Sequence, residues 1–265
     1  MDFEKPSRAA VKQLGKLLRG KYRQREGMFI AEGRKVVDEL LRSDWRPAAL
    51  FLEEGKEDAW KPPAASRPGG AKEETRTYVL TPEEWRRLSQ DRESEGIMAL
   101  VRLVRQPEWP DLLHHGTGNI LLLDRINNPN NLGAILRTAH WFGFSTVFLS
   151  ADTADWTHPK TVRSSMGSLF HLALAAGLDF RILLPEVRRC CLLIGSDVRA
   201  GVPPHYPGRR TALLLGSESH GLPDDYLEIA DERWHIPGAG DAESLSVPQA
   251  AAIMMYEISG GGSKP

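Results

Sequence analysis

Residues 121–144, LLLDRINNPNNLGAILRTAHWFGF, predict a buried strand, a turn rich in asparagine and a helix. The uninterrupted apolar run at 120–123 is typical of a parallel strand that is covered on both faces. The asparagines and proline of residues 127–131 then break the chain. In open α/β sheets, ligands bind at the carboxyl ends of the strands, where this turn must lie. We therefore expect Asn131, in the turn, and Arg137, in the helix, to face one crevice.

The composition is that of an ordinary globular protein, with 41% hydrophobic and 26% charged residues. No apolar run reaches membrane-spanning length, and the opening residues MDFEKPSRAA lack the apolar centre of a signal peptide. Cys190 and Cys191 are adjacent, and disulfide geometry disfavours a bridge between neighbours. We therefore expect a cytoplasmic protein, away from membranes, in which both cysteines are buried and structural.

The charge of the chain is unevenly distributed. The net charge is only −1, so the overall balance does not indicate a nucleic-acid partner. Residues 1–26, however, hold eight basic and three acidic side chains, a net charge of +5. Such a local basic face can bind phosphates, although a solvated helix face explains the same pattern equally well.

Residues 1–105 are predicted to form a small α/β domain. Leucines and valines recur at helical spacing between residues 11 and 18, and Thr81-Pro82 begins another helix with a capping threonine. The Pro- and Gly-rich stretch at 61–74 is expected to be a loop. Strands are predicted at 28–31, 49–52, 78–80 and 97–104, and a further helix at 36–41.

A linker at 106–118 is predicted to lead into a second α/β domain at 119–259, followed by a flexible tail at 260–265. Strands and helices alternate along this domain, which favours a parallel sheet covered by helices. The expected strands are 120–123, 147–149, 171–173, 192–196 and 211–215, and the expected later helices are 165–169, 185–189 and 247–258.

The second motif is TALLLGSESHGLP, residues 211–223, in which a buried strand ends at Gly216. Glycine at this point lets a ligand approach the backbone closely. The G-x-G-x-x-G spacing of a dinucleotide site is absent, which argues against a nucleotide-dependent dehydrogenase. Taken alone, the motif fits an ordinary turn between a strand and a loop.

The third motif is HIPGAGDAESLSVPQAAAIMMYEI, residues 235–258. Ser244 and Ser246 stand where a helix N-cap belongs, ahead of a largely apolar final helix. Taken alone, this motif fits a capped core helix whose methionines serve packing.

Together the three motifs resemble the SpoU (TrmH-like) family of RNA 2′-O-ribose methyltransferases, within the SPOUT superfamily. The matches read N-P-x-N-L-G-A-I-x-R-T-A at 128–139, L-G-S-E-x-x-G-L at 215–222, and I-P followed by S-L-x-V at 236–247. Residues 163–167 look like the family's R-x-S-x-G segment. Residues 1–105 resemble the substrate-binding domain often found ahead of it, particularly at 25–41 and 94–101.

The resemblance implies an α/β protein whose parallel-sheet SPOUT methyltransferase domain is tied in a trefoil knot, preceded by a small α/β RNA substrate-binding domain. It also implies S-adenosylmethionine as the cofactor, bordered by Leu215, Gly216, Ile236 and Leu245. An apolar slot edged by free backbone groups suits an adenine ring.

The resemblance makes Arg137 the catalytic arginine and Asn131 its partner, while Glu218, Ser244 and Ser246 complete the site. Some mechanisms for the family assign proton abstraction to the arginine. An arginine side chain stays protonated at neutral pH and is a poor base. We therefore favour a role in orienting the RNA hydroxyl and its phosphate and in stabilising developing alkoxide charge.

One position departs from the family, which usually has S-L-N where this chain has Ser244-Leu245-Ser246. A serine is shorter than asparagine and lacks its amide donors. The substitution is therefore expected to shift the substrate geometry or to lower the turnover rate, and to leave the fold unchanged. The rival hypothesis is a non-catalytic RNA-binding or ribosome-assembly factor that keeps the knot, and Ser246 is the residue that supports it.

The expected partners are a structured tRNA or rRNA and a second copy of the chain, with Arg137 of one protomer completing the site of the other. RNA fits because its 2′-hydroxyl is the acceptor. No metal site is expected, because the histidines lack metal-ligand spacing. The residues expected to contact RNA are Arg19, Arg23, Arg25 and Arg163.

Overall fold

The computed structural model describes residues 4–61, 75–91, 93–104, 107–241 and 243–261. The chain forms two compact units, and the first combines Met1–Arg105 with Asp155–His171, while the second combines Gln106–Ala154 with Leu172–Pro265. The predicted loop at 61–74 lies outside the described residues except for its first residue, as do residues 262–265 of the predicted tail. No described helix is long and apolar enough to cross a membrane.

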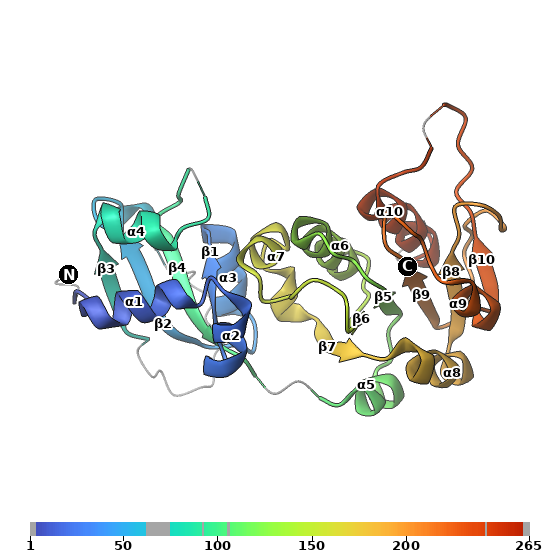
Figure 1. The fold of residues 1–265 in the computed structure, drawn as a ribbon, viewed down its shortest axis with the longest axis horizontal. Helices are drawn as coiled ribbons and strands as arrows, with labels where there is room; N and C mark the ends of the chain where they lie inside the picture. The colour runs from blue at the N-terminus through green and yellow to red at the C-terminus, as the bar shows by residue number, and fades with distance from the viewer. Residues whose placement is uncertain (1–3, 62–74, 92, 105–106, 242, 262–265) are drawn as a thin grey trace. The chain divides into compact units, whose positions relative to one another are not determined.

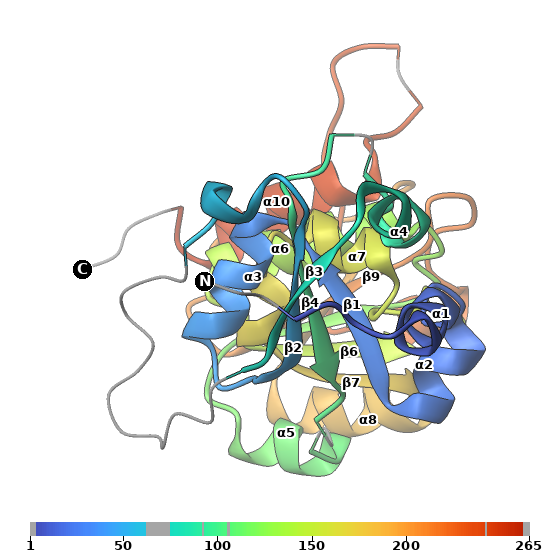
Figure 2. The same cartoon turned by 90° about the vertical axis from the view of Figure 1, so that its left-hand side faces the viewer.

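The first unit is built on a sheet of order β1-β4-β2-β3, in which β2 and β3 are parallel and the other pairs antiparallel. Helices α1 and α4 cover one face of this sheet, and α3 covers the other (Figure 2). The strands are β1 Met28–Glu32, β2 Pro47–Glu53, β3 Thr77–Leu80 and β4 Ile97–Arg102. The helices are α1 Arg8–Lys16, α2 Gly20–Glu26, α3 Arg34–Arg42, η1 Glu57–Ala59, α4 Pro82–Leu88, α7 Pro159–Ser164 and η2 Ser168–His171.

The amino end of α4 forms as the sequence predicts. Thr81 is the N-cap, and its hydroxyl accepts a hydrogen bond from the backbone N–H of Glu84. The Glu84 carboxylate accepts a bond from the backbone N–H of Thr81 in return. This capping box satisfies two of the backbone donors that a helix start leaves free.

Residues Asp155–His171 pack within the first unit although the strands before and after them belong to the second. Four aromatic rings hold them there, since Trp156 and Phe170 pack against Phe29 and Trp45 with centroids 5.7–6.4 Å apart. The helix expected at 165–169 is wrong, because the chain turns there with positive φ at Met166 and Gly167.

The second unit contains a fully parallel six-stranded sheet of order β10-β8-β9-β5-β6-β7 (Figure 1), which confirms the predicted class. The strand expected at 171–173 begins only at Ala173, and a helix, α5, forms inside the predicted linker. The strands are β5 Ile120–Leu123, β6 Thr146–Ser150, β7 Ala173–Leu178, β8 Leu192–Ser196, β9 Thr211–Leu215 and β10 Glu232–Trp234. The helices are α5 Trp109–His115, α6 Pro129–Trp141, α8 Phe180–Cys190, α9 Asp224–Ile229 and α10 Val247–Ile258.

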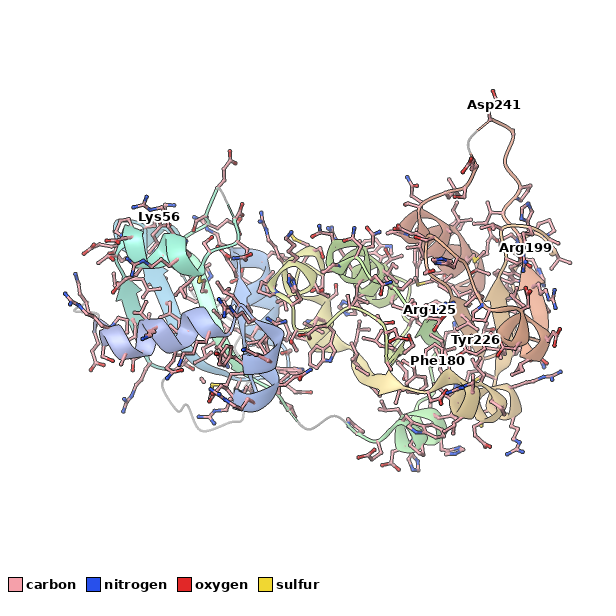
Figure 3. The ribbon with its side chains drawn as sticks, in the orientation of Figure 1. Lys56, Arg125, Phe180, Arg199, Tyr226 and Asp241 are labelled. Carbon is pink, nitrogen blue, oxygen red and sulfur yellow. The ribbon has the colours of Figure 1, made fainter. Side chains whose placement is uncertain are left out.

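The two faces of this sheet are covered by different helices. Leu122 of β5 and Leu214 of β9 pack into a core with α5, α8 and α9. Side chains alternate along a strand, so Leu213 and Leu215 point to the opposite face, where α10 packs on β9 and on α6. On the first face, the Phe180 and Tyr226 rings lie 6.4 Å apart (Figure 3).

The cysteine prediction holds for only one of the two residues. Cys191 is buried, whereas Cys190 is exposed at the end of α8, and both are free thiols. Consecutive residues of a helix end point in different directions, so adjacency in sequence does not give a shared environment.

Candidate functional site

The candidate site lies at the carboxyl ends of β5 and β9, two neighbouring strands at the centre of the second unit's sheet (Figure 1). Leu123 and Leu215 are in register, and the backbone N–H of Asp124 donates to the carbonyl of Leu215 at 2.9 Å. The turns that carry the first two motifs therefore leave the sheet at the same level.

The first motif opens α6. Asn128 is the N-cap, its side-chain oxygen accepts from the backbone N–H of Asn130 at 2.9 Å, and Pro129 takes the first helical position. Asn131 therefore lies in the first turn of the helix and not in the preceding turn. Its Nδ2 donates to Oε1 of Glu218 at 2.5 Å, so the first and second motifs meet through these side chains.

Arg137 lies further along α6 and is exposed. Its side chain makes no hydrogen bond or ion pair with any described residue. With 3.6 residues per turn, six residues rotate the side-chain direction by about 240°, so Asn131 and Arg137 point about 120° apart. Asn131 contacts Glu218, while the side chain of Arg137 is exposed, and that the two residues face one crevice stays a prediction.

Gly216 follows β9 at a point where the backbone doubles back on itself. A Cβ at this residue would lie 2.4 Å from the carbonyl carbon of Gly221 and 2.5 Å from the amide nitrogen of Leu222. Gly221 has φ 63°, and its N–H donates to the carbonyl of Ser217 at 2.9 Å. The close approach that requires a glycine is thus made by the chain's own loop.

Arg125, which no motif in the sequence indicates, lies beside the candidate site (Figure 3). Its φ is 53°, an unusual conformation for a residue with a side chain. Its Nε donates to the buried Asp124 carboxylate at 2.7 Å, its Nη2 to the carbonyl of Gly221 at 3.4 Å, and its backbone N–H to Ser150 Oγ at 3.0 Å. Arg125 therefore joins the loops after β5, β9 and β6, a role that no local sequence pattern indicates.

The third motif leads into α10, which packs against α6. Ser246 is the N-cap, and Oε1 of Gln249 accepts from its backbone N–H at 3.2 Å and from its hydroxyl at 3.0 Å. The Phe142 and Tyr256 rings, 6.0 Å apart, join the far ends of the two helices. Ser246 is thus held by its own helix, and Ser244 and Leu245 precede it as exposed residues.

The residues expected to border a cofactor come from separate strands. Leu215 ends β9 and is buried, while Ile236 follows β10, which β8 separates from β9. Two strand spacings amount to about 10 Å, which is the span of a nucleoside rather than of a single ring. The backbones of Ile236 and Leu245 make no hydrogen bond to other described residues.

Four arginines were predicted to contact RNA, and for Arg23 this prediction is wrong. Its side chain is 2% exposed and forms an ion pair with Asp155, so it cannot reach RNA. Arg19 is exposed, and the exposed Arg25 pairs with Glu26 at 2.6 Å. Arg163 is half-exposed and binds the carboxylate of Asp91.

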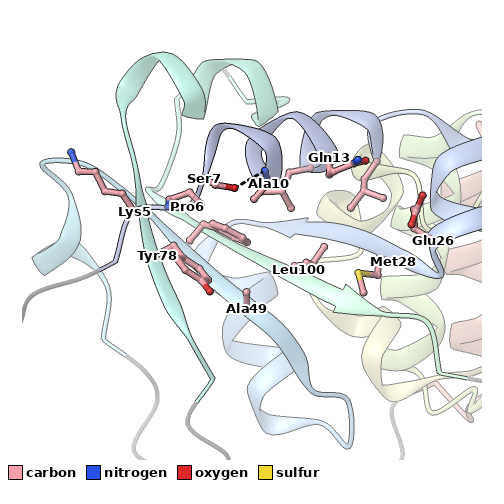
Figure 4. A pocket seen from close by; sticks show the side chains of 13 residues that line it. Lys5, Pro6, Ser7, Ala10, Gln13, Glu26, Met28, Ala49, Tyr78 and Leu100 are labelled. Carbon is pink, nitrogen blue, oxygen red and sulfur yellow. Dashed lines mark hydrogen bonds between the residues drawn. The ribbon is translucent and has the colours of Figure 1, made fainter.

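A groove of about 500 Å³ lies in the first unit between α1 and the sheet (Figure 4). Its floor is apolar, and its two ionic members at opposite ends, Lys5 and Glu26, are paired with Glu54 and Arg25. The groove holds no pair of groups suited to acid–base chemistry. No cluster of three or more His, Cys, Asp or Glu that could hold a metal occurs in the described part of the chain.

The chain is similar to known proteins over nearly its whole length. The SpoU rRNA Methylase family matches residues 118–256, and an MRM3-like substrate binding domain matches residues 8–99. The 23S rRNA (guanosine(2553)-2'-O)-methyltransferase of Bacillus subtilis (strain 168) is 28% identical over 261 residues, which cover 97% of this chain and 99% of that protein.

Several solved structures are similar over almost the entire chain, among them the following two. A TrmH-family protein from Porphyromonas gingivalis is 31% identical, with a TM-score of 0.78 over 96% of this chain and 98% of the other. The SpoU methyltransferase AviRb from Streptomyces viridochromogenes, in complex with the cofactor AdoMet, is 25% identical, with a TM-score of 0.79 over 96% and 97%.

Proposed function

Because this chain belongs to the SpoU rRNA methylase family, we propose that it transfers a methyl group from S-adenosylmethionine to a ribose 2′-hydroxyl of structured rRNA or tRNA. Ribosomal RNA is the favoured substrate, because the B. subtilis relative is named for it. The observation that carries the proposal is the 2.5 Å contact between Asn131 and Glu218, which joins two family motifs in one site. Such a protein would work in the cytoplasm.

The residues at the site suit the cofactor. Leu215 provides an apolar wall, Gly216 keeps the loop compact, and the unengaged backbone groups of Ile236 and Leu245 would hold the adenosine. When bound, the cofactor supplies an electrophilic methyl group. Arg137 donates hydrogen bonds to the ribose hydroxyl and the adjacent phosphate, and it stabilises the negative charge that develops on the attacking oxygen. Glu218, held by Asn131, and the two serines before α10 line the acceptor side.

We propose that the active protein is a homodimer in which Arg137 serves the partner's site. Arg137 points about 120° away from Asn131 along α6 and has no described partner in its own chain. Close to it, α6 and α10 expose apolar side chains: Trp141 is 82% exposed, Tyr256 44% and Ile253 39%. A second copy packed on these helices would cover this apolar surface and bring a second Arg137 to the site.

The strand order supports a trefoil knot in the second unit. After β8, the chain returns to place β9 between β8 and β5, leaves again to add β10 at the edge, and then returns as α10 against α6 and β9. A carboxyl-terminal segment that passed through earlier loops along such a path would complete the knot, an arrangement that most folds avoid. Residues 119–259, apart from residues 155–171 of the first unit, would form the knotted catalytic domain, and residues 106–118, which include α5, would join it to the RNA-binding residues 1–105.

The rival function, a non-catalytic RNA-binding or assembly factor, rests on Ser246 in place of asparagine. Titration calorimetry with S-adenosylmethionine separates the two hypotheses, because the enzyme must bind it and the rival need not. Mapping ribose methylation in rRNA and tRNA from cells with and without the gene then names the target. Heat of binding together with one lost 2′-O-methyl group supports the proposal. The absence of both favours the rival.

A further inference from the structure

Three cationic groups converge on the ring of Tyr22 in the first unit. Arg25 places its guanidinium carbon 4.9 Å from the ring centroid, Lys21 its Nζ at 5.0 Å, and Lys16 its Nζ at 5.8 Å. Lys16 ends α1, and the other residues lie on α2. We refer to these four side chains as the Tyr22 cluster.

The cluster is presented by a firmly anchored helix. Arg23, the next residue, is buried and bonds to Asp155, Thr157 and the carbonyl of Leu17. Because successive helical residues point about 100° apart, this anchor holds α2 by one side and leaves Tyr22 half-buried on another. The ring and its cations are therefore available to a partner without any rearrangement of the helix.

The energies of the alternative contacts favour an incoming base over the resident cations. Compared contact by contact, a base stacked on an aromatic ring stabilises more than an exposed cation over the same ring. Three cations also compete for the two faces of one ring. The ion pair of Arg25 with Glu26 is exposed on both sides, so it adds little stability and does not fix the guanidinium.

We propose that the Tyr22 cluster binds an unpaired nucleotide of the substrate RNA. This inference rests on the proposed function only in that it takes RNA as the partner. The base stacks on Tyr22, and Lys16, Lys21 and Arg25 move onto the phosphates on either side. Bases inside an A-form helix offer no free face to such a ring, so the site selects a loop, bulge or end. A duplex would meet only the three cations.

Fluorescence anisotropy with two RNAs of equal length, a hairpin with an unpaired loop and a full duplex, tests this site. Tyr22→Leu keeps the apolar volume and removes the stacking face, so hairpin affinity should fall about 5- to 150-fold. Duplex affinity should stay within about twofold, as for an ordinary surface change. Tyr22→Phe keeps the stacking face and should bind both RNAs like the wild type. An equal loss on both RNAs, or no loss on the hairpin, would overturn the proposal.

A charge control separates stacking from simple attraction. Replacing Lys16, Lys21 and Arg25 together by alanine should weaken binding of both RNAs. The salt slope should fall by about 2 on unpaired RNA and by about 3 on the duplex, since each lost phosphate contact removes about 0.7 and 0.9 respectively. In the matched control, Arg42, Arg86 and Arg87, which are bonded within their own helices, are replaced by alanine. This control should leave both the RNA affinity and the salt slope unchanged. Identical salt slopes for the two triple variants would also refute the site. Because these assays read binding alone, their result is independent of whether the wild type methylates RNA.

Discussion

The ion pair between Arg23 and Asp155 gives the sharpest stability prediction. Arg23 is 2% exposed, and its Nη2 lies 2.5 Å from an Asp155 oxygen. Thr157 Oγ1 at 3.0 Å and the carbonyl of Leu17 at 2.8 Å are its other acceptors. The change Asp155→Ala therefore leaves the buried, charged guanidinium of Arg23 with neutral hydrogen-bond acceptors only.

Removing one partner of a buried ion pair costs about 3–5 kcal/mol, because the other charge is left uncompensated. Asp155 is itself 32% exposed, and two acceptors of Arg23 remain, so we expect the lower end, about 3 kcal/mol. Adding Arg23→Met removes the stranded charge. The double variant should therefore be more stable than Asp155→Ala alone.

Urea unfolding followed by tryptophan fluorescence measures these differences, because Trp45 and Trp156 lie 6.3 Å apart in the same unit. The matched control is Glu83→Ala, since Glu83 and Arg87 also lie 2.5 Å apart but are 69% and 67% exposed. That change should cost less than about 1 kcal/mol. Equal costs for Asp155→Ala and Glu83→Ala would refute the reasoning that burial of the cation sets the energy.

Three further changes are predicted. Burial opposes ionisation of Asp155, but hydrogen bonds from Thr157 and Arg23 and the Arg23 charge outweigh it and hold its pKa below the ordinary value. Its stabilisation is therefore complete above about pH 4 and disappears as the pH falls further, so urea midpoints from pH 5 to 2 should fall more steeply for wild type than for Asp155→Asn. Gly216→Ala drives a Cβ into the Gly221 backbone and should lower stability by about 1–3 kcal/mol in the same assay, whereas Gly238→Ala, with open space around it, should not. Ser246→Asn keeps a good N-cap, so thermal melting should be unchanged while methyl transfer rises, and Ser246→Ala should cost about 1 kcal/mol.

Local patterns in the sequence predict the elements that local physics determines. The bounds of α10, 247–258, and the capping box at Thr81 follow from apolar spacing and cap chemistry that lie within a few residues. The parallel sheet of the second unit follows from the alternation of apolar strands with helices. The family resemblance, carried by three short motifs, is confirmed by the match over residues 118–256.

The features that the sequence does not predict depend on contacts between distant residues. Arg23 stands among seven other basic residues and looks like one of a surface set, yet its partner is 132 positions away. Residues Asp155–His171 join the first unit through aromatic contacts that no periodicity reveals. The sequence predicts that Gly216 lets a ligand approach the backbone. In the structure, the backbone of Gly221 occupies the space that a side chain at residue 216 would need.

The most direct test of methyl transfer uses S-adenosylmethionine labelled in its methyl group and rRNA from cells that lack the gene. Wild type and Arg137→Ala are compared, and the digested RNA is examined for labelled 2′-O-methylnucleosides. The wild type should place the label on a ribose oxygen, and Arg137→Ala should be slower by about 100-fold or more, because it lacks the group that stabilises the charge on that oxygen. Equal incorporation by both proteins, or label on a base instead of a ribose, would contradict the account.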